Sequence, residues 1–353
     1  MAAHRDNTQR IYVGPVPVGG GAPVTIQSMT NTLTRDAEMT VAQIRALEKA
    51  GCDIVRVSVP DEESAKAFRE IKLSARIPVI ADIHFDYRLA IAAIENGADG
   101  IRINPGNIGG REKVKAVARC AIQADIPIRV GVNLGSVKKK LLKAHGEDRV
   151  GALVENAGEY VRMLEDMGVS SMKVSLKSSD VLETIDAYRR FSRISRWPLH
   201  LGVTEAGTLF SGLIRSSAGI GALLLEGIGD TIRVSLSADP VQEVTAGRVL
   251  LEGIGLRKEG VRVIACPTCA RTNADVASIA MEVEDALKEV KTHLVVAVMG
   301  CVVNGPGEAR TADLGVACDT NGAVLFVHGK PVRRISAAEI TQTLIDEVEK
   351  EIV

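Results

Sequence analysis

The feature that most constrains the fold is a short strand-like segment that recurs eight times between about residues 24 and 250. Each segment is rich in Val, Ile and Leu, and each precedes an amphipathic, helix-like stretch. Such alternation is typical of right-handed βαβ units, whose strands lie side by side in a parallel sheet. The predicted strands cover residues 23–29, 53–59, 77–84, 100–104, 127–133, 172–177, 199–205 and 230–236.

Eight strand–helix units in about 225 residues match the size of a (β/α)8 barrel. An open doubly wound sheet is the main alternative, but no G-x-G-x-x-G motif follows the first predicted strand. We therefore expect an α/β protein in which residues 1–252 form a TIM-type barrel. The connection between Asn133 and Met172 is longer than the others and contains three consecutive lysines. It is either a solvated surface excursion or a basic lid over the barrel mouth.

The pattern changes after residue 252, where residues 252–260 resemble a linker. Residues 260–353 predict a second, small α+β domain. A tight-turn sequence at residues 319–322 is typical of a hairpin. The expected elements are strands at 261–265 and 293–299, hairpin strands at 314–317 and 324–327, and helices at 274–290 and 337–351.

Charge and hydropathy restrict the partners. The chain has 43 basic and 44 acidic residues, so no global field favours nucleic acid. The first ten residues lack an apolar secretory segment, and no apolar run approaches the roughly 18 residues that span a bilayer. We expect a cytoplasmic protein with neither a nucleic-acid nor a membrane partner. In that compartment thiols stay reduced, so a C-x-x-C pair more often binds metal or carries redox chemistry.

Three cysteines and a glutamate in the second domain follow the spacing C-x2-C-x31-C-x6-E. They are Cys266, Cys269, Cys301 and Glu308. Both cysteine groups follow predicted strands, in segments whose proline and glycines keep the backbone irregular. An iron–sulfur cluster with a non-thiolate fourth ligand leaves one iron exchangeable. A catalytic zinc similarly keeps one position open. The spacing therefore predicts a metal centre with chemistry of its own, and both metals fit it.

The remaining cysteines have simpler interpretations. Cys52 and Cys120 lie in apolar patterns and are predicted to be small core residues. Cys318 lies beside the predicted hairpin, outside the metal centre. A redox C-x-x-C usually opens a helix in a thioredoxin-like domain. Here Pro267 follows the first cysteine and a third cysteine recurs at another strand end, which favours metal.

Polar and charged residues follow most of the predicted barrel strands, at the end where barrel enzymes carry their chemistry. Because unpaired charges inside a barrel are costly, so many cations indicate a bound polyanion, most simply a diphosphate. Arginine forks would bind it through two hydrogen bonds each. The predicted substrate-binding residues are Arg56, Arg102, Arg129, Asn133, Lys173, Ser175, Arg233 and Ser235.

Five motifs carry a resemblance to a known family. They are I-N-P-G-N-I-G at 103–109, V-G-V-N-L-G-S at 130–136, L-G-V-T-E-A-G at 201–207, C-P-T-C at 266–269 and C-V-V-N-G-P-G-E at 301–308. Together they closely resemble the 4-hydroxy-3-methylbut-2-enyl diphosphate synthase family of the non-mevalonate isoprenoid pathway. The resemblance covers essentially the whole chain, in the short bacterial two-domain form.

The resemblance implies a [4Fe-4S] cluster held by Cys266, Cys269, Cys301 and, in the resting state, Glu308. It implies reductive ring opening of 2-C-methyl-D-erythritol 2,4-cyclodiphosphate with loss of water. Two electrons would come one at a time from flavodoxin or ferredoxin. It also implies a homodimer in which the cluster domain of one subunit covers the barrel of the other.

Within that chemistry, Glu205 is the predicted proton donor to the departing hydroxyl, with Asp82 and His84 as alternatives. Asn304 is predicted to hydrogen-bond the substrate near the cluster. Glu308, a weaker iron ligand than thiolate, would give way to a substrate oxygen. Two other hypotheses remain: a zinc-dependent barrel acting on a phosphorylated substrate, and an iron–sulfur redox sensor whose barrel is only a scaffold.

Overall fold

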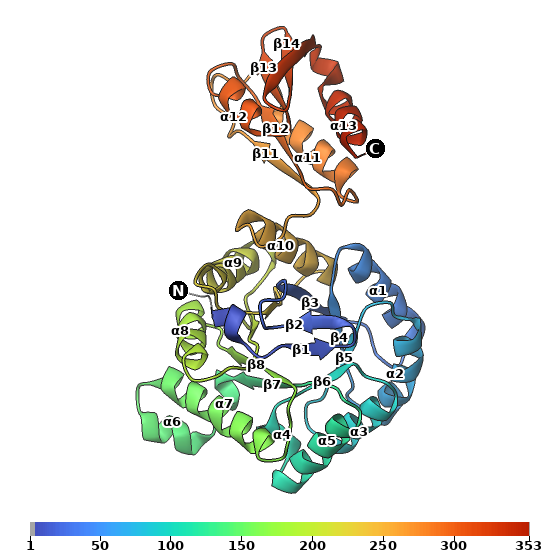
Figure 1. Cartoon of the computed structure of the whole chain (residues 1–353), viewed down its shortest axis with the longest axis vertical. Helices are drawn as coiled ribbons and strands as arrows, with labels where there is room; N and C mark the ends of the chain where they lie inside the picture. Colours follow the sequence, from blue (N-terminus) through green and yellow to red (C-terminus); the bar gives the residue numbers. More distant parts are fainter. Residues whose placement is uncertain (1–3, 353) are drawn as a thin grey trace. The chain divides into compact units, whose positions relative to one another are not determined.

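The computed structural model describes residues 4–352. The chain forms two compact units, Met1–Arg257 and Lys258–Val353 (Figure 1). The predicted domains, 1–252 and 260–353, include residues 1–3 and 353, which lie outside the described part. Within residues 4–352, no helix combines the length and apolar character needed to cross a membrane.

Eight parallel strands form the central sheet of the first unit, which confirms the predicted (β/α)8 fold. They follow the order β8-β7-β6-β5-β4-β3-β10-β9, and a bridge between Val174 and Leu199 joins the two ends of the sheet. The strands are β3 (Thr25–Met29), β4 (Ile54–Ser58), β5 (Val79–Asp82), β6 (Gly100–Ile103), β7 (Ile128–Asn133), β8 (Met172–Lys177), β9 (His200–Leu201) and β10 (Thr231–Ile232).

The last two barrel strands are shorter than the sequence pattern predicts. Strands over 199–205 and 230–236 were expected, but β9 and β10 contain two residues each. The backbone leaves the sheet after Leu201, and Glu205 adopts a left-handed conformation with φ of 54°. An extended strand cannot contain that conformation. The apolar alternation therefore continues past the point where backbone pairing stops.

Helices surround the barrel sheet, one following most strands (Figure 1). Several begin at an aspartate whose carboxylate accepts a backbone N–H of the first turn; Asp61, for example, accepts from Ser64 at 2.7 Å. The main helices are α1 (Ala37–Lys49), α2 (Glu62–Ser74), α3 (Tyr87–Glu95), α5 (Arg111–Gln123), α7 (Arg149–Glu165), α8 (Val181–Ser192), α9 (Leu209–Leu225) and α10 (Pro240–Gly253).

The long connection after β7 folds as two helical pieces before α7. The 3-10 turn η2 (Leu134–Ser136) precedes α6 (Lys139–His145). Lys138 pairs with Glu159 of α7 at 2.6 Å and lies 4.8 Å from the Tyr160 ring centroid. One of the three lysines is thus held against α7, while its two neighbours are exposed.

A short antiparallel hairpin, β1 (Ile11–Val13) and β2 (Val16–Val18), was not predicted from the sequence. Its apolar residues join the barrel core, with Val13 and Val18 fully buried. The turn residue Gly14 lies close to Pro78 and Asp99, which directly precede β5 and β6. The hairpin therefore covers the N-terminal end of the barrel. Nearby, the Thr8 hydroxyl donates to the Asp230 carboxylate at 2.9 Å.

The second unit is a five-stranded sheet in the order β11-β12-β13-β14-β15, with its first three strands parallel and the rest antiparallel. Helices α11 and α13 share one apolar cluster with the sheet, and α12 packs into a smaller one. The elements are β11 (Val261–Ala265), α11 (Val276–Leu287), β12 (Leu294–Met299), α12 (Gly305–Thr311), β13 (Leu314–Asp319), β14 (Gly322–Val327), β15 (Lys330–Ile335) and α13 (Ile340–Glu351).

Strand β15 escaped sequence prediction because its burial pattern does not alternate. It is an edge strand with one neighbour, and all its residues except Ile335 are exposed. Its three basic residues and one proline are typical of edge strands that resist further pairing. Periodicity detects a strand only where one face is buried.

We predict that Phe68→Ala destabilises the barrel by about 3–5 kcal/mol, because a fully buried aromatic ring leaves a cavity. Leu73→Ala on the same helix is the control, since Leu73 is 79% exposed and its loss should change the free energy of unfolding by about 0.5 kcal/mol or less. The fluorescence of the single tryptophan, Trp197 in the first unit, would follow urea unfolding of the barrel. Equal effects of the two variants would contradict the packing of α2.

Candidate functional site

Cationic side chains converge inside the barrel from neighbouring strands. Arg102, Arg129 and Lys173 are register partners on β6, β7 and β8, so their side chains point to the same side of the sheet. Lys173 and Arg129 are 1% and 2% exposed. The interior cations are Arg56, Arg102, Arg129, Lys173, Lys177 and Arg233.

Two glycines make room for these long side chains. A Cβ at Gly131 would lie 2.5 Å from Nε of Arg102, and a Cβ at Gly202 would lie 2.8 Å from Nζ of Lys177. Gly131 belongs to the V-G-V-N motif and Gly202 to the L-G-V-T motif. In both motifs the glycine therefore gives space to a cation from a neighbouring part of the barrel.

The buried Asp82 carboxylate holds two of the guanidiniums. Nε of Arg56 lies 3.3 Å from one carboxylate oxygen and Nη1 of Arg102 lies 3.1 Å from the other. His84, half exposed, approaches Asp82 at 3.6 Å. Burial alone would raise the pKa of Asp82, but Arg56, the hydrogen bond with His84 and Arg102 together hold it well below its usual range. Asp82 is therefore better suited to anchoring cations than to donating a proton.

Sequence reasoning missed a second interior carboxylate, Glu243. It lies on α10, and its two oxygens accept from Nε and Nη2 of Arg233 at 3.1 and 3.2 Å. It also accepts from the Ser28 hydroxyl and the Leu236 backbone N–H, both at 3.0 Å. In the sequence, Glu243 could have been recognised by its position, because it is an acidic residue on the face of α10 that carries Val244 and Leu251 into the core.

Not every interior cation has a partner. Arg129 donates to the Gln27 amide oxygen at 3.1 Å and to the Ser175 hydroxyl at 3.1 Å. Nζ of Lys173, by contrast, has no hydrogen-bond partner among residues 4–352. Burial, followed by Arg129 and Arg56, lowers the pKa of Lys173 to about 7. Burial also holds the pKa of Lys177 well below its usual value. Six basic side chains therefore face two carboxylates in the described barrel, Asp82 and Glu243, and a bound anion would favour the charged forms of the two lysines.

Other predicted residues lie near the mouth without joining this network. Asn133 ends β7, where its backbone carbonyl accepts from the Ser136 hydroxyl at 2.8 Å. Ser235 is half-buried beyond β10. Glu205 is exposed in the turn that follows β9. Loops after parallel barrel strands lie at the C-terminal end of the barrel, the end away from the β1–β2 hairpin.

The three predicted cysteine ligands line one small cavity in the second unit. Cys266 directly follows β11, Cys269 lies three residues later, and Cys301 follows β12. The cavity measures about 160 Å³, and Asn304 also lines it. The backbone N–H of Gly300 donates to Sγ of Cys266 at 3.1 Å. The Arg271 backbone N–H, donating to the sulfur of Cys269, lowers the pKa of that thiol.

Glu308 is exposed on α12, and it does not line the cavity. Three cysteines and Asn304 thus come together, whereas the predicted fourth ligand lies outside. Within residues 4–352, no three His, Cys, Asp or Glu side chains surround one ion position. In a [4Fe-4S] cube each cysteine binds its own iron, so its sulfurs lie farther apart than around a single zinc. Three thiols around one cavity are a donor set that an iron–sulfur cluster takes.

The other cysteines are placed differently. Cys52 and Cys318 are buried in apolar clusters, and burial raises the pKa of the first thiol to about 12 and of the second to about 11. Cys120 is half-buried on α5. None of the three lines the cysteine cavity of the described chain.

Two family models match the chain. Residues 8–248 match the GcpE TIM-barrel domain, and residues 262–350 match the GcpE protein C-terminal domain.

Curated relatives match over nearly their full length, and they are named 4-hydroxy-3-methylbut-2-en-1-yl diphosphate synthase (flavodoxin). The chain is 52% identical to the protein of Anoxybacillus flavithermus over 99% of this chain and 95% of the relative. It is 53% identical to that of Caldanaerobacter subterraneus over 99% of each. Among solved structures, Yersinia pestis dihydropteroate synthase has a TM-score of 0.51 at 9% identity, over 70% of this chain and 97% of that one. That likeness shows a shared fold alone.

Lys173 should make the stability of the protein depend on pH. Its pKa in the folded chain, about 7, lies below the roughly 10.4 expected when unfolded. The unfolded state therefore binds more protons between these values, and the free energy of unfolding rises with pH from about 7 upward. Lys173→Met removes this titration. The free energy of unfolding of the variant minus that of the wild type should therefore fall by on the order of 2 kcal/mol between pH 7 and 9.

Urea unfolding followed by Trp197 fluorescence at several pH values would measure this difference. Lys66→Met on the exposed side of α2 is the matched control and should leave the pH profile unchanged. Parallel profiles for the wild type and Lys173→Met would show that Lys173 keeps its ordinary titration in the folded barrel.

Proposed function

The chain belongs to the GcpE family, and from this we propose how its own residues carry out the reaction for which the curated relatives are named. The enzyme is an iron–sulfur oxidoreductase of the non-mevalonate route to isoprenoids. It opens the ring of 2-C-methyl-D-erythritol 2,4-cyclodiphosphate reductively: a ring C–O bond breaks, two electrons and two protons enter, and one molecule of water leaves. The observation that carries the site assignment is the barrel interior, where six cations face two carboxylates.

The barrel cations would bind the cyclic diphosphate. Arg102, Arg129 and Lys173 form a row of donors, and Arg56 and Arg233 flank it. Asn133, Ser175 and Ser235 would add neutral hydrogen bonds. Because Asp82 and Glu243 already orient three of the guanidiniums, little reorganisation is needed when the substrate enters. Lys173 would gain its missing partner.

Glu205 is the proposed proton donor to the departing hydroxyl. It projects from the mouth loop after β9, where a substrate held by the barrel cations would lie within reach. Asp82 is a poorer candidate, because its pKa lies well below the usual range. His84 contacts Asp82 and would orient that carboxylate. Asn304, which lines the cysteine cavity, would hydrogen-bond the substrate on the cluster side.

Cys266, Cys269 and Cys301 would hold a [4Fe-4S] cluster, with Glu308 as the fourth ligand. When bound, the cluster would supply the electrons and one iron open to exchange. Glu308 suits an exchangeable role, because it lies on an exposed helix turn outside the cavity that the thiols line.

The relatives bear on the electron donor, and the assembly is a separate proposal. The relatives are named with flavodoxin, which supports flavodoxin as the donor, with ferredoxin as the alternative. We further propose a homodimer in which the cluster domain of one subunit covers the barrel of its partner. Such a pairing would place electrons and bound substrate in one closed site.

Anaerobic purification and an activity assay test this function. We expect brown protein with about four irons per chain that converts the cyclic diphosphate when reduced flavodoxin, or dithionite with a mediator, is supplied. Cys301→Ser should lose both the colour and the turnover, whereas Cys120→Ser on α5 should keep both. Colourless protein with stoichiometric zinc would contradict the cluster. Brown protein that binds but never converts the cyclic diphosphate would favour a sensor.

Glu205→Gln should lower kcat by about 10²–10⁴-fold, because the amide cannot donate the proton that the leaving hydroxyl needs. KM should change little, since the cations that bind the diphosphate remain. Glu70→Gln, an exposed glutamate on α2, is the control and should keep full activity. Visible absorption would verify the cluster in both variants. Full turnover by Glu205→Gln with an intact cluster would remove Glu205 from the mechanism.

A further inference from the structure

Two motifs of the barrel contain residues that the proposed chemistry leaves without a role. Asn104, in the I-N-P-G-N-I-G motif, directly follows β6, and Ser136, in the V-G-V-N-L-G-S motif, ends the turn η2 that follows β7. Strands β6 and β7 pair side by side in the sheet, so both residues lie at the C-terminal edge of the barrel. Asn133, which is proposed to bind the substrate, is the last residue of β7.

The Ser136 hydroxyl is the centre of a small hydrogen-bond network. It accepts from Nδ2 of Asn104 at 3.0 Å and from the backbone N–H of Asn133 at 3.3 Å. It donates to the backbone carbonyl of Asn133 at 2.8 Å. A hydroxyl offers one donor and two acceptor positions, so these three bonds occupy all of them. Ser136 is therefore better suited to fixing its neighbours than to binding a ligand itself.

Asn133 is held by this hydroxyl on both sides of its Cα. Because its N–H and its C=O bond to the same oxygen, neither of its backbone dihedrals can turn freely; φ is −108° and ψ is 147°. Asn133 and Ser136 also form a capping box, in which the Asn133 side-chain oxygen faces the Ser136 backbone N–H. The amide nitrogen, with its two donors, is left for a ligand. Donors of this kind match the acceptor oxygens of a diphosphate.

Neighbouring elements support the loop that carries Asn133. Asn104 is buried, and while its Nδ2 reaches into this loop, its Oδ1 accepts from the backbone N–H of Gly106 at 3.1 Å in its own loop. Farther along the chain, Lys138 pairs with Glu159 of α7 at 2.6 Å. The loop is therefore held from the end of β6 on one side and from α7 on the other.

We propose that Ser136, supported by Asn104, positions the Asn133 amide for hydrogen bonding to the diphosphate of the substrate. This role rests on the proposed function, in which Asn133 supplies one of the neutral hydrogen bonds to that group. A donor that is already oriented loses little conformational freedom when the substrate binds, so its hydrogen bond contributes more to affinity. Ser136 is thus a positioning residue, which acts through Asn133 without contacting the substrate.

Binding of the cyclic diphosphate to holoenzyme without a reductant, measured by isothermal titration calorimetry, would test this role. We expect Ser136→Ala to raise the Kd about three- to tenfold, the equivalent of one neutral hydrogen bond. Ser136→Thr keeps the hydroxyl and should bind within about twofold of the wild type. Asn133→Ala should weaken binding by at least as much as Ser136→Ala, and combining the two substitutions should cost no further affinity.

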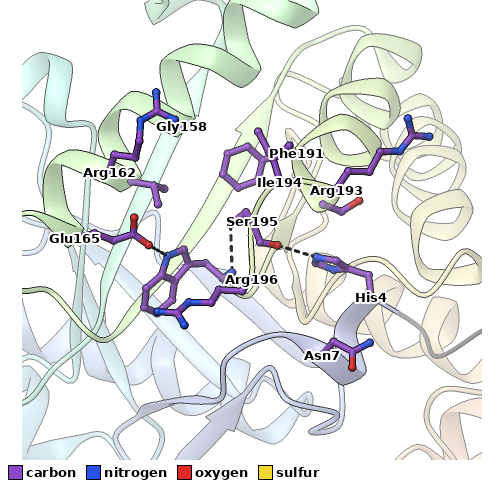
Figure 2. Close-up of a pocket in the computed structure, with 13 residues that line it drawn as sticks. His4, Asn7, Gly158, Arg162, Glu165, Phe191, Arg193, Ile194, Ser195 and Arg196 are labelled. Carbon is purple, nitrogen blue, oxygen red and sulfur yellow. Dashed lines mark hydrogen bonds between the residues drawn. The ribbon is translucent and has the colours of Figure 1, made fainter.

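Ser195→Ala is the matched control (Figure 2). Ser195 is also a half-buried serine in a loop, and its hydroxyl accepts from the Trp197 backbone N–H at 3.2 Å. It precedes β9, at the end of the barrel away from the mouth, so this variant should keep the wild-type Kd. Urea unfolding followed by circular dichroism would compare the stability of the two alanine variants. Similar losses of stability, with a raised Kd for Ser136→Ala alone, would separate positioning from general destabilisation.

Three outcomes would contradict the positioning role. If Asn133→Ala weakens binding and Ser136→Ala does not, Asn133 binds the substrate as proposed and the role of Ser136 alone fails. If Asn133→Ala leaves the Kd unchanged, the proposed function of Asn133 fails, and the role of Ser136 fails with it. If the double variant loses the full Ser136→Ala factor beyond Asn133→Ala, Ser136 acts independently of Asn133.

Discussion

The excess of positive charge inside the barrel is the constraint on which the rest of the structure depends. Six basic side chains in a closed sheet repel one another when charged and lose solvation, and among residues 4–352 two carboxylates, Asp82 and Glu243, pair with them. Individual neighbouring residues accommodate these basic side chains. Gly131 leaves space for one guanidinium, Asp82 holds two, and Glu243 reaches in from a helix to hold a third. Nζ of Lys173 has no hydrogen-bond partner in the described chain, so burying it costs stability in the free protein.

The two ends of the barrel have opposite characters, and this directs the substrate. At the N-terminal end, Val13 and Val18 of the β1–β2 hairpin extend the apolar core. At the other end the strands stop in charged and polar side chains, and the loops carry Glu205 and His84. Access to the cationic interior is therefore from the mouth.

Local sequence patterns predicted those parts of the structure that depend on local burial. The eight-fold alternation identified the barrel, and the cysteine spacing selected three thiols that share a cavity. The features that the sequence did not predict depend on partners that are distant in the sequence, and a local pattern does not record such partners. Glu243 looks like any helical glutamate until Arg233 is placed beside it. Strand β15 has one neighbour and no buried face, and β9 pairs with its neighbour over His200 and Leu201 alone.

The N-terminal hairpin has a consequence for folding during synthesis. The segment that carries it is anchored by the bond between Thr8 and Asp230, which are 222 positions apart. At about 5–20 residues per second, a ribosome takes roughly 10–45 s to make the partner of a segment that it produced first. During that time the apolar face of the hairpin has no completed barrel to cover, and contacts of such long sequence separation form slowly. The emerging chain therefore exposes the apolar face of the hairpin until its eighth barrel strand appears.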